Sequence, residues 1–266
     1  MRTAPPIVSK PMPTIRILGL HFLSVEVSMA VEQGLQGGLV VVPSAPVLVA
    51  MTEDPVLRRA LLGADHAVAD SGLMVLLWRL FTRQKLLRVS GLEYLQTLLA
   101  RKELWAAGAT FWVMPDTRAQ DRNLGWLVQQ GLSLTAADCY VAPLYPRGEI
   151  EDLRLLEILE RRRPRQVILC VGGGVQERLG LFLRDRLTYR PGIHCIGAAI
   201  GFLSGDQVNI PAWADRCYLG WLWRSFSSPR RYVPRYWKAV RLVFLLWRYR
   251  DRPPGTTEAM AGCEQA

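Results

Sequence analysis

Histidine and cysteine are scarce in this chain, and their spacing excludes the common metal and disulfide sites. The 266 residues include three histidines and five cysteines. No two cysteines form a Cys-x-x-Cys pair, and the histidines lie far apart in the sequence. Scattered thiols in odd number are typical of a reducing compartment and do not indicate a disulfide framework. We therefore expect neither a structural zinc site nor a disulfide-stabilised fold.

The chain also lacks the Asp-x-Asp pattern, which occurs nowhere in the sequence. Magnesium on a nucleoside diphosphate is usually held by one or two such carboxylates. We therefore expect no metal and no other cofactor. If a diphosphate leaves during a reaction here, arginines and helix N-termini must neutralise its charge.

Long apolar runs are absent as well. Residues 38–51 are interrupted by Pro43 and Pro46, and residues 239–247 are few and include Arg241. A membrane-spanning helix needs about 20 consecutive apolar residues, so we expect none. The first 14 residues are rich in proline and lack an apolar centre, which predicts a tail rather than a signal peptide.

Acidic residues almost disappear from the last part of the chain. Residues 216–252 contain ten Lys or Arg and one acid, Asp251, in a chain whose net charge is +10. Aromatic side chains are interleaved with these arginines, and residues 242–247 form an apolar run. Aromatic residues mixed with cations favour a lipid headgroup interface, and the apolar run argues against RNA. We expect a partner that carries phosphate or an anionic membrane surface, and no nucleic acid.

What the chain does have is a regular alternation of apolar strand-like runs with helical segments. The predicted strands cover residues 38–42, 66–69, 110–114, 166–171 and 193–196, and residues 15–23 predict a short strand or strand pair. Helices between them predict an α/β fold: a Rossmann-like, mostly parallel sheet with helices on both faces. We divide the chain into a tail (1–14), an α/β domain (15–210), a basic and aromatic helical appendage (211–252) and a second tail (253–266).

Ligands of such sheets bind beyond the carboxyl ends of the strands. One candidate there is Asp70, which follows a predicted strand and precedes Ser71-Gly72. A carboxylate in this place is well positioned as a general base. The alternative interpretation is an N-cap for the helix that begins near Leu73.

A second candidate is the loop Gly172-Gly173-Gly174, which is followed by Gln176 and Glu177. Exposed N–H groups at a helix N-terminus can hold a phosphate, whereas a plain tight turn is the alternative. The loop could also belong to a nucleotide-binding oxidoreductase. Against that, no acidic residue follows about 20 residues later at a second strand end, as the dinucleotide fingerprint requires.

Several motifs in a fixed order carry a resemblance to a known family. They are Asp54-Pro55 leading through Ala64-Asp65 to Ala69-Asp70, Arg88-Val89-Ser90-Gly91, Gln176-Glu177 after a glycine-rich strand end, Phe202-Leu203-Ser204-Gly205, and Leu219-Gly220-Trp221 with Arg224, Pro229-Arg230-Arg231 and Arg235-Tyr236. Together they resemble the WecG/TagA/CpsF family of bacterial glycosyltransferases (glycosyltransferase family 26) over roughly residues 15–247. The chain departs from the family pattern at Val42, Ser44, Gly201 and Gly220.

The resemblance implies an inverting, metal-independent enzyme at the cytoplasmic face of the bacterial inner membrane, bound peripherally. Such enzymes move a sugar, often of the N-acetylmannosamine type, from a UDP-sugar to a polyprenyl-diphosphate-linked saccharide in exopolysaccharide or other cell-surface polysaccharide biosynthesis. It implies Asp70 as the base. The implied phosphate- or membrane-contacting residues are Arg224, Arg230, Arg231 and Arg235. The implied substrate- and nucleotide-binding residues are Ser44, Ala45, Arg88, Gly172, Gly173, Gly174, Gln176, Glu177, Gly197 and Gly201.

One alternative of another class stays open beside the oxidoreductase. The departures at Ser44, Gly201 and Gly220 are also consistent with a non-catalytic membrane scaffold derived from this family. The sequence does not identify the donor sugar, the acceptor or the polysaccharide, and a homo-oligomer is compatible with it.

Overall fold

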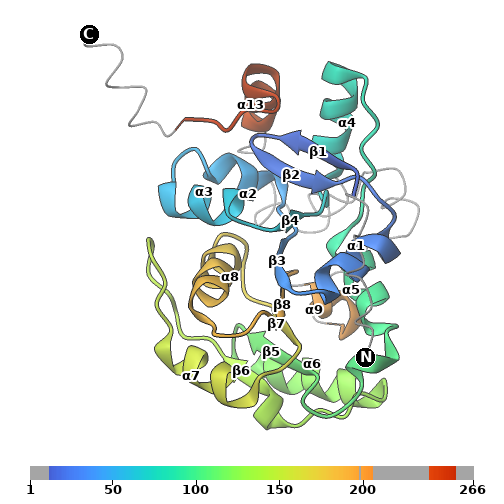
Figure 1. The fold of residues 1–266 in the computed structure, drawn as a ribbon, viewed down its shortest axis with the longest axis vertical. Helices are drawn as coiled ribbons and strands as arrows, with labels where there is room; N and C mark the ends of the chain where they lie inside the picture. Colours follow the sequence, from blue (N-terminus) through green and yellow to red (C-terminus); the bar gives the residue numbers. More distant parts are fainter. Residues whose placement is uncertain (1–11, 198, 206–239, 256–266) are drawn as a thin grey trace, which may run out of the picture.

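The computed structural model describes residues 12–197, 199–205 and 240–255 (Figure 1). In chain order the elements are β1 (Thr14–Ile17), β2 (Leu20–Leu23), α1 (Val27–Leu35), β3 (Gly38–Val41), α2 (Ala45–Ala50), α3 (Pro55–Leu62), β4 (His66–Ala67), α4 (Gly72–Thr82), α5 (Gly91–Leu99), η1 (Lys102–Leu104), β5 (Thr110–Met114), α6 (Thr117–Gln129), η2 (Ala136–Asp138), β6 (Cys139–Val141), α7 (Leu153–Arg162), β7 (Gln166–Leu169), α8 (Val175–Arg186), β8 (Gly192–Cys195), α9 (Ala199–Leu203) and α13 (Arg241–Tyr249).

The strands form one sheet in the order β1-β2-β4-β3-β8-β7-β5-β6. All neighbouring pairs are parallel except the β1–β2 hairpin. The central strands β3, β5, β7 and β8 are buried along their whole length, as expected when helices cover both faces of a parallel sheet. The predicted α/β fold class is therefore confirmed.

Two apolar cores lie on the two faces of this sheet. In β3, Leu39 and Val41 enter one core and Val40 enters the other, because successive side chains of a strand point to opposite faces. The first core also includes residues of α2, α3, α4, α7, α8 and α13, and the second includes residues of α1, α5, α6 and α9. Figure 1 shows these two layers on either side of the strands.

The helix boundaries follow simple capping chemistry. The predicted N-cap Asp54 accepts a hydrogen bond from the Leu57 backbone N–H at 2.9 Å, and Pro55 occupies the first turn of α3. Asp152 caps α7 in the same way through the Leu155 N–H at 2.9 Å.

A buried chain of polar side chains lies on one face of the sheet, beneath α1 and α5. The Tyr94 hydroxyl lies 3.0 Å from Nδ1 of His194, and Nε2 of His194 lies 2.8 Å from Oε1 of Gln166. The Gln166 amide donates to the Leu35 carbonyl at 3.3 Å, so its oxygen faces the histidine and Nε2 of His194 carries the proton. His194 is fully buried on β8, and this burial lowers its pKa to about 4. The imidazole is therefore neutral at physiological pH.

Three expectations need correction. The strand predicted at 66–69 has only two residues, β4, and the short edge strand β6 was not predicted at all. The glycine-rich segment after β8 was interpreted as a strand end, but residues 199–203 form the short helix α9. Small residues permit this turn, because α9 packs closely under α5 and α6.

The C-terminal end of the described chain is attached to the hairpin. The backbone N–H groups of Leu18 and Gly19, at the β1–β2 turn, donate to the carbonyls of Arg250 at 2.7 Å and Asp251 at 3.0 Å. Helix α13 packs against α2 and α4. It falls within the predicted appendage, most of which, with Arg224, Arg230, Arg231 and Arg235, lies outside the described residues. The proposed division into domains stays a prediction.

No helix among the described residues has the length and apolar character that crossing a bilayer requires. Within the same residues, no three His, Cys, Asp or Glu side chains gather as a group that could hold a metal ion.

Candidate active site

Asp70 lies at the carboxyl end of the sheet, just beyond β4, and it is not the cap of the following helix. Ser71 is that cap, because its Oγ accepts from the Met74 backbone N–H at 3.2 Å. Oδ1 of Asp70 instead accepts from the N–H of Gly91, the first residue of α5, at 3.0 Å. The N-cap interpretation of Asp70 is therefore wrong, and its carboxylate is held at the positive end of another helix.

A second strand-like segment fixes the Asp70 backbone. Nε of Arg88 donates to the Asp70 carbonyl at 3.0 Å, and the Val89 N–H donates to the Ala69 carbonyl at 3.1 Å. These two bonds attach the backbone of Ala69 and Asp70, just beyond β4, to residues 88–89 and so fix the position of Asp70. Asp70 is partly exposed. Among the described residues its second carboxylate oxygen has no hydrogen-bond partner, so it is available to accept a proton.

The other predicted residues follow the three strands next to β4 in the sheet. Ser44 and Ala45 follow β3, Gly197 follows β8, and the Gly172–Gly174 loop follows β7. Neighbouring strands are spaced by about 4.8 Å, so the four strand ends span roughly 14 Å. The topology therefore brings these predicted positions to one edge of the sheet, within the reach of a single nucleotide-sized ligand.

Ser44 and Ala45 have different environments. Ser44 is the residue before α2 and makes no side-chain capping bond, and it is partly exposed. Ala45 is buried, and its methyl group belongs to the core. Of the two, only the Ser44 hydroxyl offers a side-chain group to a ligand.

The Gly172–Gly174 loop is held open by the first turn of α8. Gly174 has φ of 90°, which favours glycine, and a Cβ on Gly173 would lie 2.8 Å from Cγ2 of Val47. Gly172 and Gly173 are exposed. The Gly174 N–H donates to Oε2 of Glu177 at 2.6 Å, and Nε of Arg178 donates to the Gly174 carbonyl at 2.9 Å. The far side of the loop is thus fixed, and its outer backbone faces solvent.

The side-chain amide of Gln176 is only partly hydrogen-bonded by the described residues. Its amide nitrogen donates to Oε1 of Glu177 at 3.0 Å and to the Cys195 carbonyl at 3.2 Å. Both partners are acceptors, so the amide orientation is defined. Its oxygen Oε1 is buried and has no hydrogen-bond partner. Such an orphaned acceptor is costly unless a donor arrives; it lies beside Gly197, where an added Cβ would be 3.5 Å away.

Glu177 does not reach the surface. Its side chain is fully buried, and its two oxygens accept from Gly174 and Gln176. Burial raises the pKa of this carboxyl above its ordinary value. Glu177 was expected among the nucleotide-binding residues, but its side chain is buried behind the glycine loop and supports that loop instead. Sequence reasoning also missed Gly91 and Arg178, whose contributions depend on contacts between distant segments.

Gly201 is the other prediction that changes. It is buried inside α9 rather than in a loop at the strand end. Gly197, two residues after β8, remains at the edge, with φ of 59°.

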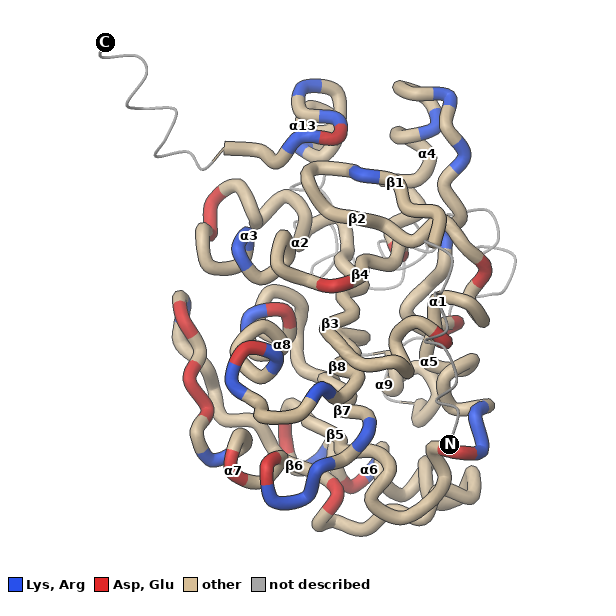
Figure 2. The backbone as a smooth tube through the Cα atoms, viewed as in Figure 1, with Lys and Arg blue, Asp and Glu red and all other residues tan. Residues whose placement is uncertain are grey.

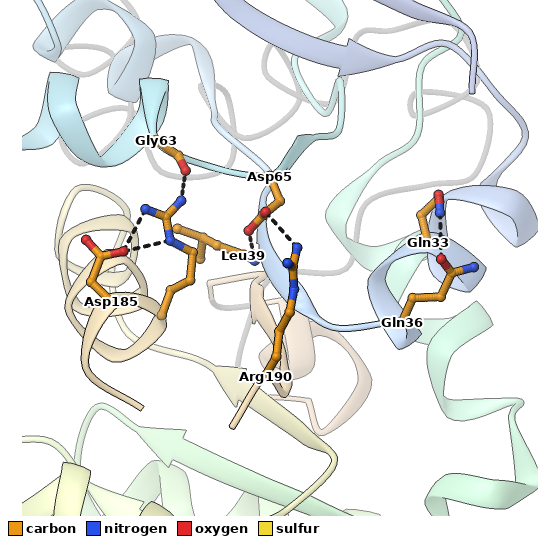
Figure 3. Close-up of polar contacts among 8 residues, drawn as sticks. Gln33, Gln36, Leu39, Gly63, Asp65, Asp185 and Arg190 are labelled. Atoms are coloured by element: carbon orange, nitrogen blue, oxygen red, sulfur yellow. Dashed lines mark hydrogen bonds and ion pairs between the residues drawn. The ribbon is translucent and has the colours of Figure 1, made fainter. Parts of the chain in front are cut away.

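A separate cavity lies at the opposite, amino edge of the sheet. It has a volume of about 410 Å³ and is lined by Asp65, Arg184, Leu187, Thr188, Tyr189, Arg190, Pro191 and Ile193. Figure 3 shows how its charges are used: Arg190 pairs with Asp65 at 2.9 Å, and Arg184 pairs with Asp185 at 2.7 Å. Asp65 also accepts from the Leu39 N–H at 2.8 Å. These groups stabilise the fold at the strand starts, far from Asp70.

The fold is an α/β fold with a mostly parallel sheet, and polar groups such as Asp70 and Gln176 lie at the carboxyl edge of that sheet. The sequence model of the glycosyl transferase WecG/TagA/CpsF family matches residues 15–255. The chain belongs to this family and is, at that level, a glycosyltransferase. A comparison with curated proteins gave no match. The family assignment removes the oxidoreductase interpretation of the glycine loop.

Proposed function

We propose that this glycosyltransferase inverts the anomeric configuration of a sugar that it moves from a UDP-sugar to a polyprenyl-diphosphate-linked saccharide. The product would serve a bacterial cell-surface polysaccharide. One observation carries the proposal: the carboxylate of Asp70, with one oxygen bound to Gly91 and the other free, lies on the same sheet edge as the glycine loop and the orphaned Gln176 oxygen.

The reaction that this arrangement supports is a single displacement. The free oxygen of Asp70 takes the proton of the acceptor hydroxyl. That hydroxyl oxygen forms a bond to the anomeric carbon while the bond from this carbon to the diphosphate breaks, and UDP leaves with the electron pair. The donor amide of Gly91 keeps Asp70 aimed and stabilises its charge before the proton arrives.

The donor would bind between the Gly172–Gly174 loop and Ser44. The exposed backbone of Gly172 and Gly173, just before α8, suits a diphosphate, and the Gln176 oxygen needs a donor such as a ring N–H or a sugar hydroxyl. We propose that leaving-group charge is neutralised by arginines, with no divalent cation, because the chain has no Asp-x-Asp pair. Arg88 and the arginines at 224, 230, 231 and 235 are the proposed residues.

The polyprenyl acceptor places the enzyme at a membrane. We propose peripheral binding at the cytoplasmic leaflet of the bacterial inner membrane through the basic and aromatic C-terminal part of the chain. Each basic residue near an anionic leaflet contributes about 1 kcal/mol to such binding, so several together suffice.

The test is UDP release from a panel of UDP-sugars: UDP-ManNAc, UDP-GlcNAc, UDP-ManNAc uronate, UDP-glucose and UDP-glucuronate. Each is combined with polyprenyl-diphosphate-GlcNAc or polyprenyl-diphosphate-glucose, with EDTA and with added Mg²⁺. We expect release that needs both substrates and is unchanged by EDTA. NMR of the product should show a β-linkage from an α-linked donor.

Two variants test whether the activity depends on Asp70. Asp70→Asn should abolish release, whereas Asp121→Asn, at an exposed aspartate of α6, should leave it unchanged. UDP binding without turnover in any pair would mean that the right sugar or acceptor lies outside the panel. Absence of both binding and turnover would favour the non-catalytic scaffold.

A further inference from the structure

Helix α4 exposes an apolar stripe on the side that faces away from the core. Its buried face consists of Met74, Val75 and Trp78. The opposite side is formed by leucines at helical spacing, Leu73, Leu76 and Leu80, none of them buried. Leu76 is 45% exposed and Leu80 is 72% exposed. A surface helix normally turns charged or polar residues outward, so this stripe needs a partner.

Helix α13 repeats this pattern. Leu242, Leu245 and Leu246 are buried against the body of the protein. The outer side carries Val240, Val243, Phe244 and Trp247, all exposed, with Phe244 and Trp247 each at 59%. The two rings lie close, with centroids 6.3 Å apart. Trp and Phe next to water-exposed cations are typical of side chains that lie in a headgroup region.

The two helices share one end of the molecule. Contacts join α13 to α4 directly, and Figure 1 shows both at the end that carries the β1–β2 hairpin, away from α6 and α7. Their exposed apolar residues therefore belong to one end of the protein rather than to scattered surface positions. Exposed apolar residues gathered in this way mark an interaction site.

The charge around these stripes has one sign. Residues 72–88 contain the basic residues Arg79, Arg83, Lys85 and Arg88 and no acid. Residues 240–252 contain Arg241, Arg248, Arg250 and Arg252 against the single acid Asp251. Arg241 is used in a pair with Glu53, and the remaining cations of α4 and α13 appear as blue bands at this end in Figure 2. An apolar centre with a basic rim complements an anionic lipid leaflet.

We propose that the outer faces of α4 and α13 form one docking surface that enters the headgroup region of an anionic bilayer. Leu76 and Leu80 contribute on α4, and Phe244 and Trp247 on α13. The proposal rests on the proposed function, because it gives the lipid-linked acceptor a defined approach. It also makes α4, which the sequence did not connect with lipid, a membrane contact in its own right.

This surface has a consequence for the active site. Helix α4 begins two residues after Asp70, and its 11 residues extend about 16 Å at 1.5 Å per residue. Asp70 therefore lies within about 16 Å of the leucines that touch the bilayer. A saccharide that projects from a headgroup-level diphosphate reaches over such a distance, so the helix acts as a spacer between lipid and base.

The test is sedimentation with vesicles of phosphatidylcholine, with and without one quarter phosphatidylglycerol. The variants are Leu76→Gln/Leu80→Gln on α4 and Phe244→Gln/Trp247→Gln on α13. The control is Leu144→Gln/Leu153→Gln, two exposed leucines around the start of α7. We expect each of the first two pairs to weaken binding to anionic vesicles at least tenfold, and the control to bind within twofold of wild type. Wild type should bind neutral vesicles at least tenfold less tightly.

Thermal melts confirm that each variant is folded. Wild-type affinity of the α4 variant would overturn the proposal. Light scattering tests the alternative that the stripe binds a second copy of the chain. That alternative would be supported if wild type were a dimer, the α4 variant were a monomer and vesicle binding were unchanged.

Sugar transfer separates this inference from the proposed function. With a short, water-soluble acceptor the α4 variant should keep wild-type kcat, and with a vesicle-embedded acceptor it should lose at least tenfold. If wild type transfers no sugar to either acceptor but the vesicle pattern holds, the docking surface stands and the proposed reaction fails.

Discussion

The two edges of the same sheet use polar groups in opposite ways. At the amino edge, Asp65, Arg190, Arg184 and Asp185 are paired with one another or with backbone around a cavity of about 410 Å³. At the carboxyl edge, no other described residue bonds to the second oxygen of Asp70, or to the buried side-chain oxygen of Gln176. Groups that satisfy one another stabilise a fold, whereas a buried polar group left unsatisfied calls for an explanation, and a ligand is the one that we propose for Gln176.

The largest expected contrast is between two aspartates at the two edges. Asp70→Asn should lower kcat by about 10²–10⁴-fold, because a positioned general base contributes that much. Asp65→Asn should keep kcat within twofold, since Asp65 acts only on the fold. Steady-state UDP release measures both. Equal loss in the two variants, or turnover near wild type in Asp70→Asn, would remove Asp70 from its role.

Between the two edges lies the buried His194, and we expect it to make the free energy of unfolding depend on pH. Its pKa is lowered to about 4 from 6.5 in the folded state, so the unfolded chain takes up the proton first as pH falls. The neutral imidazole's contribution to the free energy of unfolding is fully present above pH 6.5. It is lost as the pH falls from 6.5 to 4, a change of about 3 kcal/mol.

Urea unfolding of wild type and His194→Gln at pH 7.5, 5.5 and 4.5 checks this value. The variant starts less stable but should lose less stability on acidification, because it has no imidazole to protonate. Parallel loss in both proteins would show that other groups account for the pH dependence.

At the carboxyl edge, Gln176→Met should weaken UDP binding about fivefold, since one hydrogen bond to a ligand contributes about 1 kcal/mol. Gln36→Met provides the matched change at the amino edge, where Gln36 bonds only to Gln33 at 3.1 Å (Figure 3). Calorimetry should find UDP affinity unchanged in that variant. If Gln176→Met binds UDP as wild type does, its oxygen faces no ligand group.

The smallest effect is expected from the amino-edge ion pair. Arg190 is 68% exposed in its pair with Asp65, and exposed pairs contribute about 0–1 kcal/mol. Arg190→Met should therefore shift the midpoint of thermal unfolding by a few degrees at most and leave UDP release unchanged. Loss of UDP release in this variant would connect the amino-edge cavity with substrate binding.

The sequence predicted correctly the features that depend on residues close together in the chain. Buried β-branched runs located the central strands, and Asp54-Pro55 located the start of α3. The position of Asp70 at a strand end was also legible. Its hydrogen bond to Gly91 was not, because 21 residues separate the two and only the folded sheet edge brings them together. The same holds for Gln176, whose partner Cys195 comes from the next strand.

Other features had no local signal. Strand β6 is three residues long and only partly buried, so no apolar run marks it. Glu177 has the sequence position of an exposed first-turn residue, and only its contacts with Gly174 and Gln176 reveal that it is fully buried. The exposed leucines of α4 also had no signal, because a sequence does not show which side of an apolar helix is covered.

The central claim is that the donor binds at the carboxyl edge, and a crystal structure with UDP tests it most directly. The account predicts the diphosphate against the Gly172–Gly174 backbone, with Oε1 of Gln176 within hydrogen-bond distance of the ligand and Asp70 facing the place of the sugar. UDP bound instead in the amino-edge cavity, among Asp65, Arg184 and Arg190, would contradict it.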